Sequence, residues 1–252
     1  MATPKRVAIV TGAAVGIGKA TAIRLAQDGW NIALNDLPSS IDKLVQVAEQ
    51  VSLTGGEAIL VPGDVSEEEA VKKMIDDTVE KLGGVDAMIA NAGISSVAPL
   101  THMTAETWDK TFAVNARGTF LCYKYAILQM IKQGRGGRVV GASSAYGKKA
   151  GPNCAHYSAT KFAIRGLTQA AAQEVGKHGI TVNAYAPGFI NTPMLQNLPD
   201  EVKVAVKEIW NAQGYEGQPE DVANVVSFLV SEKSGLINGQ TLSINGGWHV
   251  MD

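Results

Sequence analysis

Short apolar runs alternate along this chain with longer amphipathic stretches, and this alternation limits the possible folds more than any other feature of the sequence. The apolar runs cover Arg6–Val10, Asn31–Leu34, Ala58–Val61, Asp86–Ala90, Arg138–Ala142, Thr181–Ala186 and Thr241–Ile244. Nearly continuous apolar strands separated by helices are typical of a parallel sheet that is covered on both faces. The sequence therefore predicts an α/β fold, with one doubly wound parallel sheet of about seven strands.

The stretches between these runs have helical patterns. Helices are expected from the first glycine-rich turn to about residue 28, and over 41–53, 67–82, 105–133 (with an interruption near Asn115), through Tyr157 to about residue 177, and over 219–230. The least regular part is 188–218, which contains a helical patch at Glu201–Trp210. A segment of this length at a ligand-binding edge is predicted to act as a lid over the substrate.

The residues that follow the strands suggest where a ligand binds. Right-handed crossovers bring the carboxyl ends of parallel strands to one edge, where α/β proteins bind their ligands. Residues with backbone or side-chain groups suited to binding fall at or just after these ends: Gly12, Asp36, Asp64, Asn91, Ser144 and Pro187. We expect a single site at this edge.

The first strand leads into a glycine-rich turn and then a helix. Gly12 allows the chain to turn, Gly16 allows the backbone to approach a pyrophosphate, and Gly18 allows the helix to pack close to the strand. The free N–H groups of the helix N-terminus would bind anionic oxygens. The alternative is an ordinary tight turn, but the strand–turn–helix context favours a dinucleotide site in a Rossmann-type fold.

Asp36 ends the second strand and follows the glycine-rich turn by about 20 residues, the usual spacing for a carboxylate that binds an adenosine ribose. A carboxylate there repels a 2′-phosphate, and the neighbouring positions Val15 and Leu37 offer no cation to bind one. The sequence therefore favours NAD(H) over NADP(H). The alternative is that Asp36 is a plain turn residue before Pro38.

Tyr157 and Lys161 are four positions apart, so they lie about one turn apart on one face of a helix. An ammonium beside a phenol favours the phenolate and lowers its pKa. Ser144, just past the apolar run that ends at Ala142, could hold a carbonyl or alcohol oxygen against this phenol. Alone, such a Tyr-Lys pair would more often mark a solvated helix face.

The composition excludes several classes of function. The chain has 252 residues, a net charge of −2 and two cysteines. This charge gives no basis for binding nucleic acid or an anionic membrane, no apolar run is long enough to span a bilayer, and the cysteines are too few for a disulfide framework. We expect a cytoplasmic protein with one domain over residues 1–252 and no metal site.

Taken together, these motifs resemble those of the short-chain dehydrogenase/reductase family, and the resemblance covers nearly the whole chain. The matching residues are Thr11-Gly12-x-x-x-Gly16-Ile17-Gly18, Asn91-Ala92-Gly93, Asn115, Ser144, Tyr157-x-x-x-Lys161 and Pro187-Gly188. The resemblance implies an NAD-dependent oxidoreductase that acts on a CH–OH group.

The resemblance also implies catalytic roles for individual residues. Tyr157 would be the general acid/base, and Ser144 would bind and polarise the substrate oxygen. Lys161 would hold the nicotinamide ribose and lower the tyrosine pKa. The main-chain carbonyl of Asn115 would hold a water in the proton relay. Ser143 is a rival to Ser144, but the spacing from the tyrosine favours Ser144.

By the same resemblance, the cofactor would be bound by Gly12, Val15, Gly16, Ile17, Gly18, Asp36, Leu37, Asp64, Val65, Asn91, Ala92, Gly93, Tyr157, Lys161, Pro187, Gly188, Ile190 and Thr192. The substrate would be bound by Ser144, Tyr146, Asn153 and Tyr157. His156 is next to Tyr157 but about 100° away around a helix, so we expect it to point elsewhere.

The stretch at 161–169 resembles the subgroup of acetoin and diacetyl reductases and butanediol dehydrogenases, which suggests a small neutral ketone or secondary alcohol as substrate. One alternative is a 3-oxoacyl thioester reductase, for which Arg117, Lys124 and Arg135 could contact an acidic carrier protein. Another is a regulator that senses NADH without catalysis, although such proteins usually lose part of the tyrosine–lysine–serine set.

The resemblance further implies a homo-oligomer, usually a tetramer. Small residues on the tyrosine helix would allow a second helix to approach closely, although some of them must face the sheet instead. These residues are Ala159, Ala163, Ala170, Ala171 and Ala172.

Overall fold

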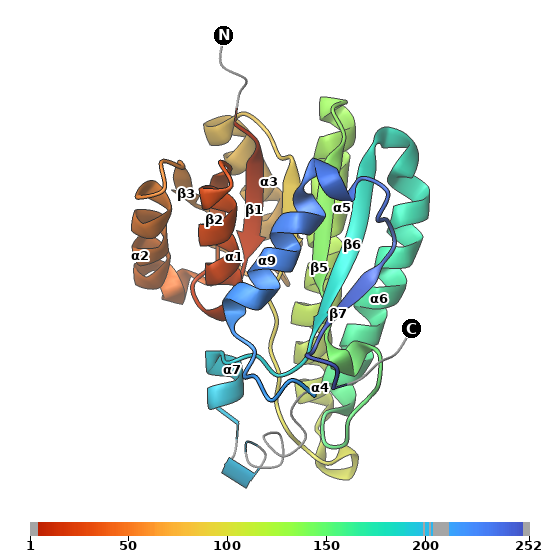
Figure 1. Cartoon of the computed structure of the whole chain (residues 1–252). Helices are drawn as coiled ribbons and strands as arrows, with labels where there is room; N and C mark the ends of the chain where they lie inside the picture. Colours follow the sequence, from red (N-terminus) through yellow and green to blue (C-terminus); the bar gives the residue numbers. More distant parts are fainter. Residues whose placement is uncertain (1–4, 199, 202, 204–211, 249–252) are drawn as a thin grey trace.

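The computed structural model describes residues 5–198, 200–201, 203 and 212–248 of the chain (Figure 1). Its centre is a sheet of seven parallel strands in the order β3-β2-β1-β4-β5-β6-β7. The strands are β1 (Val7–Thr11), β2 (Asn31–Asn35), β3 (Ala58–Leu60), β4 (Ala87–Ala90), β5 (Gly137–Ala142), β6 (Ile180–Pro187) and β7 (Thr241–Ile244). The fold class predicted from the alternating pattern is therefore confirmed.

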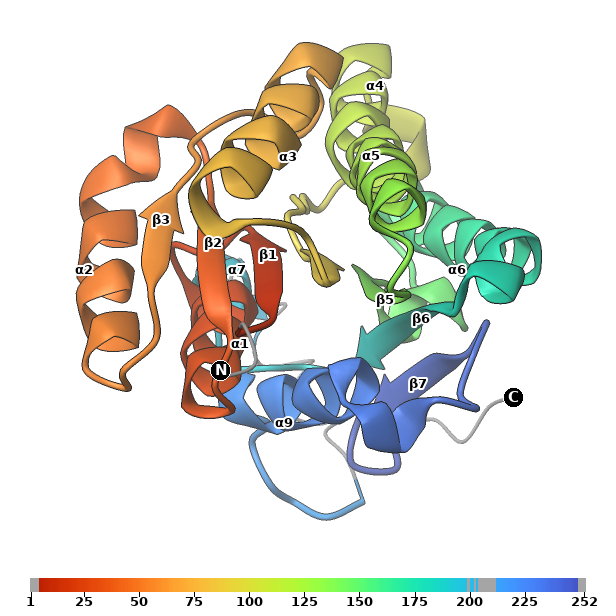
Figure 2. The ribbon, with the colours of Figure 1, turned by 90° about the horizontal axis from the view of Figure 1, so that it is seen from above.

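Helices cover both faces of the sheet, as the view from above shows (Figure 2). The helices on one face are α1 (Gly16–Gln27), α2 (Ile41–Ser52) and α9 (Pro219–Val230), and those on the other are α3 (Glu68–Leu82), α5 (Gly118–Gln133) and α6 (Ala155–Val175). Leu25 and Leu44 belong to the core on the first face, and Met74 and Leu121 to the core on the second. No helix in the described ranges is long and apolar enough to cross a membrane.

The strand order fixes where a ligand can bind. From β1 the chain adds β2 and β3 in one direction, and from β4 it adds β5, β6 and β7 in the other. The order therefore reverses between β1 and β4, and α/β sheets bind ligands outside the carboxyl ends of the strands at such a point. The short helix α7 (Pro193–Gln196) lies near the carboxyl ends of the strands, where the ligand is expected to bind (Figure 1).

The long helical stretch predicted for 105–133 consists of three parts. It begins as α4 (Ala105–Thr111), continues as the π-helical segment Phe112–Arg117, and then becomes α5. The expected interruption near Asn115 is thus a wider helical turn and not a break in the chain. π-Helical turns are rare and are frequent at functional sites.

The two ends of segment 188–218 lie side by side. Ile190 and Gly217 form an isolated parallel β-bridge, and the Asn191 N–H donates to the carbonyl of Gly217 over 2.8 Å. A Cβ on Gly217 would lie 2.7 Å from Ile190 Cδ1 and 3.1 Å from the carbonyl oxygen of Phe189, so a larger residue there would require the Ile190 side chain to shift. The helical patch predicted at Glu201–Trp210 lies almost entirely outside the described residues.

The small residues on α6 divide between the two sides of the helix. Ala171 and Ala172 are buried against the sheet, whereas Ala163 and Ala170 are exposed. Such a division was expected from the sequence. Contact between the exposed side and a second copy of the chain stays a prediction.

Candidate active site

A cleft of about 440 Å³ lies at the reversal point of the sheet. Most residues predicted to bind a cofactor line it: Gly12, Val15, Gly16, Ile17, Asp36, Leu37, Asp64, Val65, Asn91, Ala92, Gly93, Tyr157, Lys161, Pro187 and Thr192. Three predicted residues, Gly18, Gly188 and Ile190, do not line this cleft. The expected strand ends therefore meet at one cavity, while the binding role of each residue stays a prediction.

The glycine-rich turn between β1 and α1 has the tight geometry that its sequence suggests. Gly12 and Gly16 have φ angles of 64° and 56°, in the left-handed region that favours glycine. Gly18 is required for another reason, because a Cβ there would lie 2.0 Å from the carbonyl oxygen of Gly12. Val15 provides no side-chain cap for α1, so the first-turn N–H groups stay available to anionic oxygens.

Asp36 ties the end of β2 to the glycine-rich turn. Its Oδ2 accepts a hydrogen bond from the Ala14 N–H over 3.1 Å, and its Oδ1 accepts one from the Leu37 N–H over 2.8 Å. The flanking side chains of Val15 and Leu37 are uncharged and 39% and 47% exposed. The carboxylate is therefore held at the cleft with no cation on either flank.

The cleft also contains residues that were given no individual cofactor or substrate role from the sequence: Asn35, Gly63, Ile94, Lys110, Val114, Ala142, Ser143, Tyr185, Pro193 and Met194. Of these, Ser143 was weighed against Ser144, and Pro193 and Met194 lie in the predicted lid. Tyr185 lies within β6 and Asn35 at the end of β2. Both carry a polar group on a buried strand, and that was the signal available for finding them. Val114 carries no comparable signal, because apolar residues in helical segments usually belong to a core. Met194 lies in the segment 188–218, which was predicted to cover the substrate.

The structure brings Tyr157 and Ser144 together. Their side chains lie close enough to interact, and Ser144 Oγ accepts the Tyr146 N–H over 3.1 Å. Ser144 is 8% exposed and begins the 3₁₀ turn Ala145–Gly147 after β5, while Tyr157 lies in the first turn of α6. Because Ser144 accepts from the backbone, its own O–H stays available to a neighbouring oxygen.

Lys161 is held in place by two hydrogen bonds with the end of β5. Its Nζ donates to the carbonyl of Ala142 over 2.7 Å, and Ser143 Oγ donates to the main-chain carbonyl of Lys161 over 2.9 Å. The lysine Nζ also lies 5.3 Å from the centroid of the Tyr157 ring. Ser143, the rival to Ser144, thus joins α6 to β5, while Ser144 contacts the phenol.

The electrostatics differ from the sequence expectation. Burial raises the pKa of Tyr157 to about 12, although the hydrogen bond from Ser144 acts in the opposite direction. Burial also lowers the pKa of Lys161 to about 8. From the sequence, the lysine was expected to lower the pKa of the phenol, but in this structure desolvation is the larger effect on both groups.

Asn115 joins the π-helical segment to the loop after β4. Its Oδ1 accepts the Ile94 N–H over 2.8 Å, and its Nδ2 donates to the Ile94 carbonyl over 2.9 Å. The main-chain carbonyl of Asn115, which was expected to hold a water, accepts a hydrogen bond from Thr119 Oγ1 over 2.7 Å. A Cβ on Gly93 would lie 3.3 Å from Asn115 Oδ1 and 3.5 Å from Lys161 Nζ, so these residues are close neighbours.

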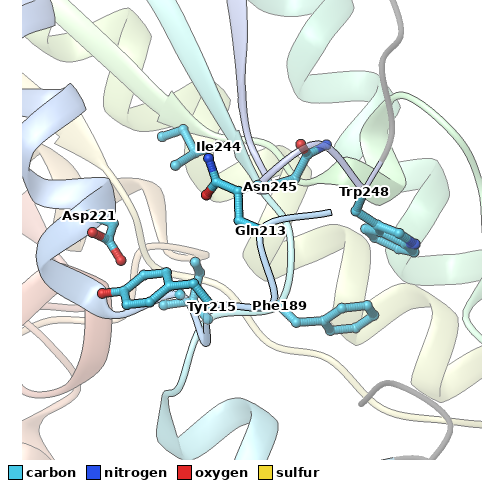
Figure 3. Close-up of a pocket in the computed structure, with 10 residues that line it drawn as sticks. Phe189, Gln213, Tyr215, Asp221, Ile244, Asn245 and Trp248 are labelled. Carbon is cyan, nitrogen blue, oxygen red and sulfur yellow. The ribbon is translucent and has the colours of Figure 1, made fainter. Parts of the chain in front are cut away.

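Three aromatic rings gather around Tyr146, two residues after Ser144. The Tyr146 ring lies 6.3 Å from the Phe189 ring and 5.9 Å from the Trp248 ring, and the latter two are 4.8 Å apart. Figure 3 shows Phe189 and Trp248 at one side of a second cavity of about 170 Å³. At the other side of this cavity the hydroxyl of Tyr215 points toward the carboxylate of Asp221. The sequence suggested Tyr146 as a substrate contact but missed Trp248.

Asn153, the other predicted substrate contact, has an unusual backbone. It has a φ of 60°, the one positive φ outside glycine in the described ranges, and its carbonyl accepts the Ala98 N–H over 2.9 Å. Its side chain is exposed and lines neither of the two cavities. The structure therefore shows a loop-forming role for Asn153, and a substrate contact stays a prediction.

His156 is fully buried and lies outside the cleft, as its angle on the helix suggested. Its Nε2 is 2.8 Å from Ser96 Oγ, and burial lowers its pKa. Within the described ranges, no group of three or more His, Cys, Asp or Glu side chains could hold a metal ion.

Comparison with known proteins connects this site to a family. A family model described as Enoyl-(Acyl carrier protein) reductase matches residues 12–249. The short-chain dehydrogenase/reductase eriH of Hericium erinaceus is 48% identical over 245 residues, which cover 96% of this chain and 97% of the relative. The 3-oxoacyl-[acyl-carrier-protein] reductase FabG of Staphylococcus epidermidis is 39% identical over 243 residues, covering 96% and 98%.

Among solved structures, the acetoin dehydrogenase YohF of Salmonella typhimurium superimposes with a TM-score of 0.88 at 32% identity and covers 98% of both chains. The parallel sheet and the cleft at its edge are those of a Rossmann-type α/β protein. More specifically, the chain belongs to the short-chain dehydrogenase/reductase family, whose enzymes use nicotinamide cofactors. The names of these relatives give different substrates, so the acetoin and butanediol subgroup stays a prediction.

Proposed function

We propose that this enzyme transfers a hydride between NAD(H) and a small neutral ketone or secondary alcohol, with Tyr157 as general acid/base. One observation carries the proposal. The phenol of Tyr157 lies beside Ser144 and Lys161, in a cleft that also contains the glycine-rich turn and Asp36. The proposed proton donor and the residues proposed to bind the dinucleotide therefore line one cavity.

The cofactor and three side chains would have separate roles in this reaction. The nicotinamide, when bound, would supply or accept the hydride. Ser144 would donate its O–H to the substrate oxygen, and Tyr157 would give that oxygen a proton in reduction and remove it in oxidation. The charged form of Lys161, 5.3 Å from the phenol ring, would favour the phenolate and so oppose the effect of burial on the tyrosine pKa.

Asp36 supports the choice of NAD(H) over NADP(H). Both carboxylate oxygens already accept main-chain N–H groups, which keeps the carboxylate facing the cleft. Ribose hydroxyls can donate to these oxygens, whereas a 2′-phosphate at the same place would meet a like charge.

Replacing Asp36→Ser together with Leu37→Arg should reverse this preference. The double change removes the repelling charge and adds a phosphate-binding cation, so the NADH-to-NADPH ratio of kcat/KM should fall by about 100-fold. Steady-state kinetics with both cofactors measure the ratio. Asp42→Ser, at an exposed acidic residue in the first turn of α2, is the matched control and should leave it unchanged. A double variant that keeps the wild-type preference would contradict the cofactor assignment.

The surroundings of Ser144 support a neutral, largely apolar substrate. The rings of Tyr146, Phe189 and Trp248 lie together, and none of these side chains carries a formal charge. The similarity to a structure named acetoin dehydrogenase also supports a small neutral substrate.

A panel of free ketones, diketones and secondary alcohols, assayed with NAD(H) and NADP(H), tests the proposed function. We expect turnover of small neutral compounds with NAD(H), followed by the absorbance of the reduced nicotinamide. The matched comparison uses substrates of similar size that carry a carboxylate, which should react poorly. No turnover of any neutral ketone or alcohol would refute the proposal.

Reduction of a 3-oxoacyl thioester is the second candidate, because relatives named 3-oxoacyl-[acyl-carrier-protein] reductase are 39% identical to this chain. The cations that could contact an acidic carrier have partners within the chain. Lys124 Nζ lies 3.1 Å from Glu68, Arg135 Nε lies 2.7 Å from Asp86, and Arg117 donates to the Ser66 carbonyl. These contacts favour free small ketones, and including an acyl thioester in the panel separates the two candidates.

A further inference from the structure

Tyr185 is a buried phenol whose role neither the motifs nor the proposed chemistry explains. It lies in β6, is 1% exposed, and lines the cleft that contains Tyr157. Its hydroxyl donates to Oδ1 of Asn91 over 2.7 Å. The bond connects β6 to the end of β4, which lies on the other side of β5 in the sheet.

Asn91 passes this connection on to the glycine-rich turn. Its Nδ2 donates to the carbonyl of Thr11 over 2.8 Å and to that of Gly12 over 3.3 Å, and its main-chain N–H donates to Thr11 Oγ1 over 3.0 Å. The amide is also in close packing contact with the turn. A Cβ would lie 2.9 Å from Asn91 Nδ2 if placed on Gly12, and 2.6 Å if placed on Gly18.

The two ends of an asparagine amide have nearly the same shape but opposite hydrogen-bonding properties. The carbonyls of Thr11 and Gly12 require the NH₂ group on their side, so the amide oxygen must face the other way. There it would be a buried acceptor without a donor unless a hydroxyl were present, and Tyr185 supplies that hydroxyl. A phenylalanine would have the same ring but no donor.

We infer that Tyr185 is a positioning residue for the cofactor: its hydroxyl fixes the orientation of the Asn91 amide, which in turn holds the glycine-rich turn in its binding shape. The inference rests on the proposed function, because it assumes that this turn binds the dinucleotide. Burial raises the pKa of Tyr185, so the phenol remains a donor over the range in which the enzyme would work. Tyr185 therefore acts through Asn91 and takes no part in proton transfer.

Tyr185→Phe tests the inference through binding as well as turnover. Losing the hydroxyl should raise the Kd of NADH about tenfold, because one buried hydrogen bond is removed and its acceptor is left unsatisfied. The rate at saturating cofactor should stay within about threefold of wild type, and the pH profile of kcat should not shift, because the acid/base group is unchanged. Fluorescence titration with NADH gives the Kd without any substrate.

Tyr123→Phe is the matched control. Tyr123 is also 1% exposed, and its hydroxyl lies 3.0 Å from Thr168 Oγ1, away from the glycine-rich turn. Both variants should lose some stability in urea unfolding, but only Tyr185→Phe should weaken NADH binding. A double-mutant cycle with Asn91→Ala adds a second measurement: once Asn91 is alanine, Tyr185→Phe should have little further effect on the Kd.

The outcomes separate the two proposals. If Tyr185→Phe binds NADH as tightly as wild type, the positioning role is wrong and the proposed function is unaffected. Equal weakening by Tyr123→Phe, or full additivity with Asn91→Ala, would also overturn the positioning role. If the wild-type enzyme binds neither NADH nor NADPH, the proposed function itself is wrong.

Discussion

Tyr157→Phe should lower kcat by about 1,000-fold, because general acid/base catalysis contributes roughly 10²–10⁴ to a rate. The change removes the hydroxyl that interacts with Ser144 and keeps the ring beside Lys161. NADH affinity should change little, since the glycine-rich turn and Asp36 are untouched. Initial rates and an NADH fluorescence titration measure the two effects separately.

Tyr125→Phe controls for the loss of a tyrosine hydroxyl in general. The Tyr125 hydroxyl donates to Glu68, and its ring lies near Lys124 on the side of α5 that faces α3, outside the cleft. The kcat of Tyr125→Phe should match that of the wild type. If Tyr157→Phe retained more than about a tenth of the wild-type kcat, the acid/base role of Tyr157 would be excluded, because even the weakest catalysis of this kind contributes more.

Gly18→Ala should damage both stability and cofactor binding. The added Cβ would lie 2.0 Å from the Gly12 carbonyl oxygen and 2.6 Å from Asn91 Nδ2, so the turn or the start of α1 must move. Overpacking of this kind costs about 1–3 kcal/mol or more of unfolding free energy. Urea unfolding measures that loss, and we expect NADH affinity to fall at least tenfold, as one backbone shift of this size misplaces the N–H groups.

Gly166→Ala makes the same chemical change in a helix where the structure has room for it. Gly166 lies in α6, and no heavy atom outside its own helix backbone and its chain neighbours lies within 4 Å of a Cβ there. Alanine should raise the unfolding free energy by about 0.5–1 kcal/mol, because it restricts the unfolded chain more than glycine does. Equal effects of the two variants would show that close packing at Gly18 does not matter.

The strand ends explain why so much of the fold and the cleft could be predicted from the sequence. Apolar runs identify buried strands, and parallel strands connected by helices must bring their carboxyl ends to one edge. Gly12, Asp36 and Asn91 therefore meet in the cleft although they are far apart in the chain. The predicted strand limits differ from the observed ones by about one residue, as at Thr11 and Pro187, because the ends of elements depend on local hydrogen bonding.

Tyr185 and Trp248 show what the sequence could not provide. Tyr185 sits in an apolar strand, and only the three-dimensional register reveals that its hydroxyl reaches Asn91. Trp248 lies near the end of the chain with no motif around it, and it meets Phe189 and Tyr146 because β7 is next to β6. Such contacts depend on which strands are neighbours and on the direction of each side chain, which periodicity does not specify.

The pKa of Tyr157 could not be predicted from the sequence for a similar reason. Its spacing from Lys161 correctly suggested that the two side chains would be close, and the lysine Nζ lies 5.3 Å from the phenol ring. How deeply both groups are buried is a property of the whole packed molecule, and that burial determines the direction of both shifts.

The two hydrogen bonds that join Lys161 to the end of β5 also affect the entropy of the reaction. A free lysine side chain samples many rotamers, and ordering it costs roughly 1.5–2 kcal/mol. Here the ammonium is anchored on Ala142 and the main-chain carbonyl of the lysine accepts the Ser143 hydroxyl, so that ordering takes place when the protein folds. An incoming ligand therefore meets a cation whose freedom has already been removed, and the energy of its binding remains available for aligning the reacting atoms.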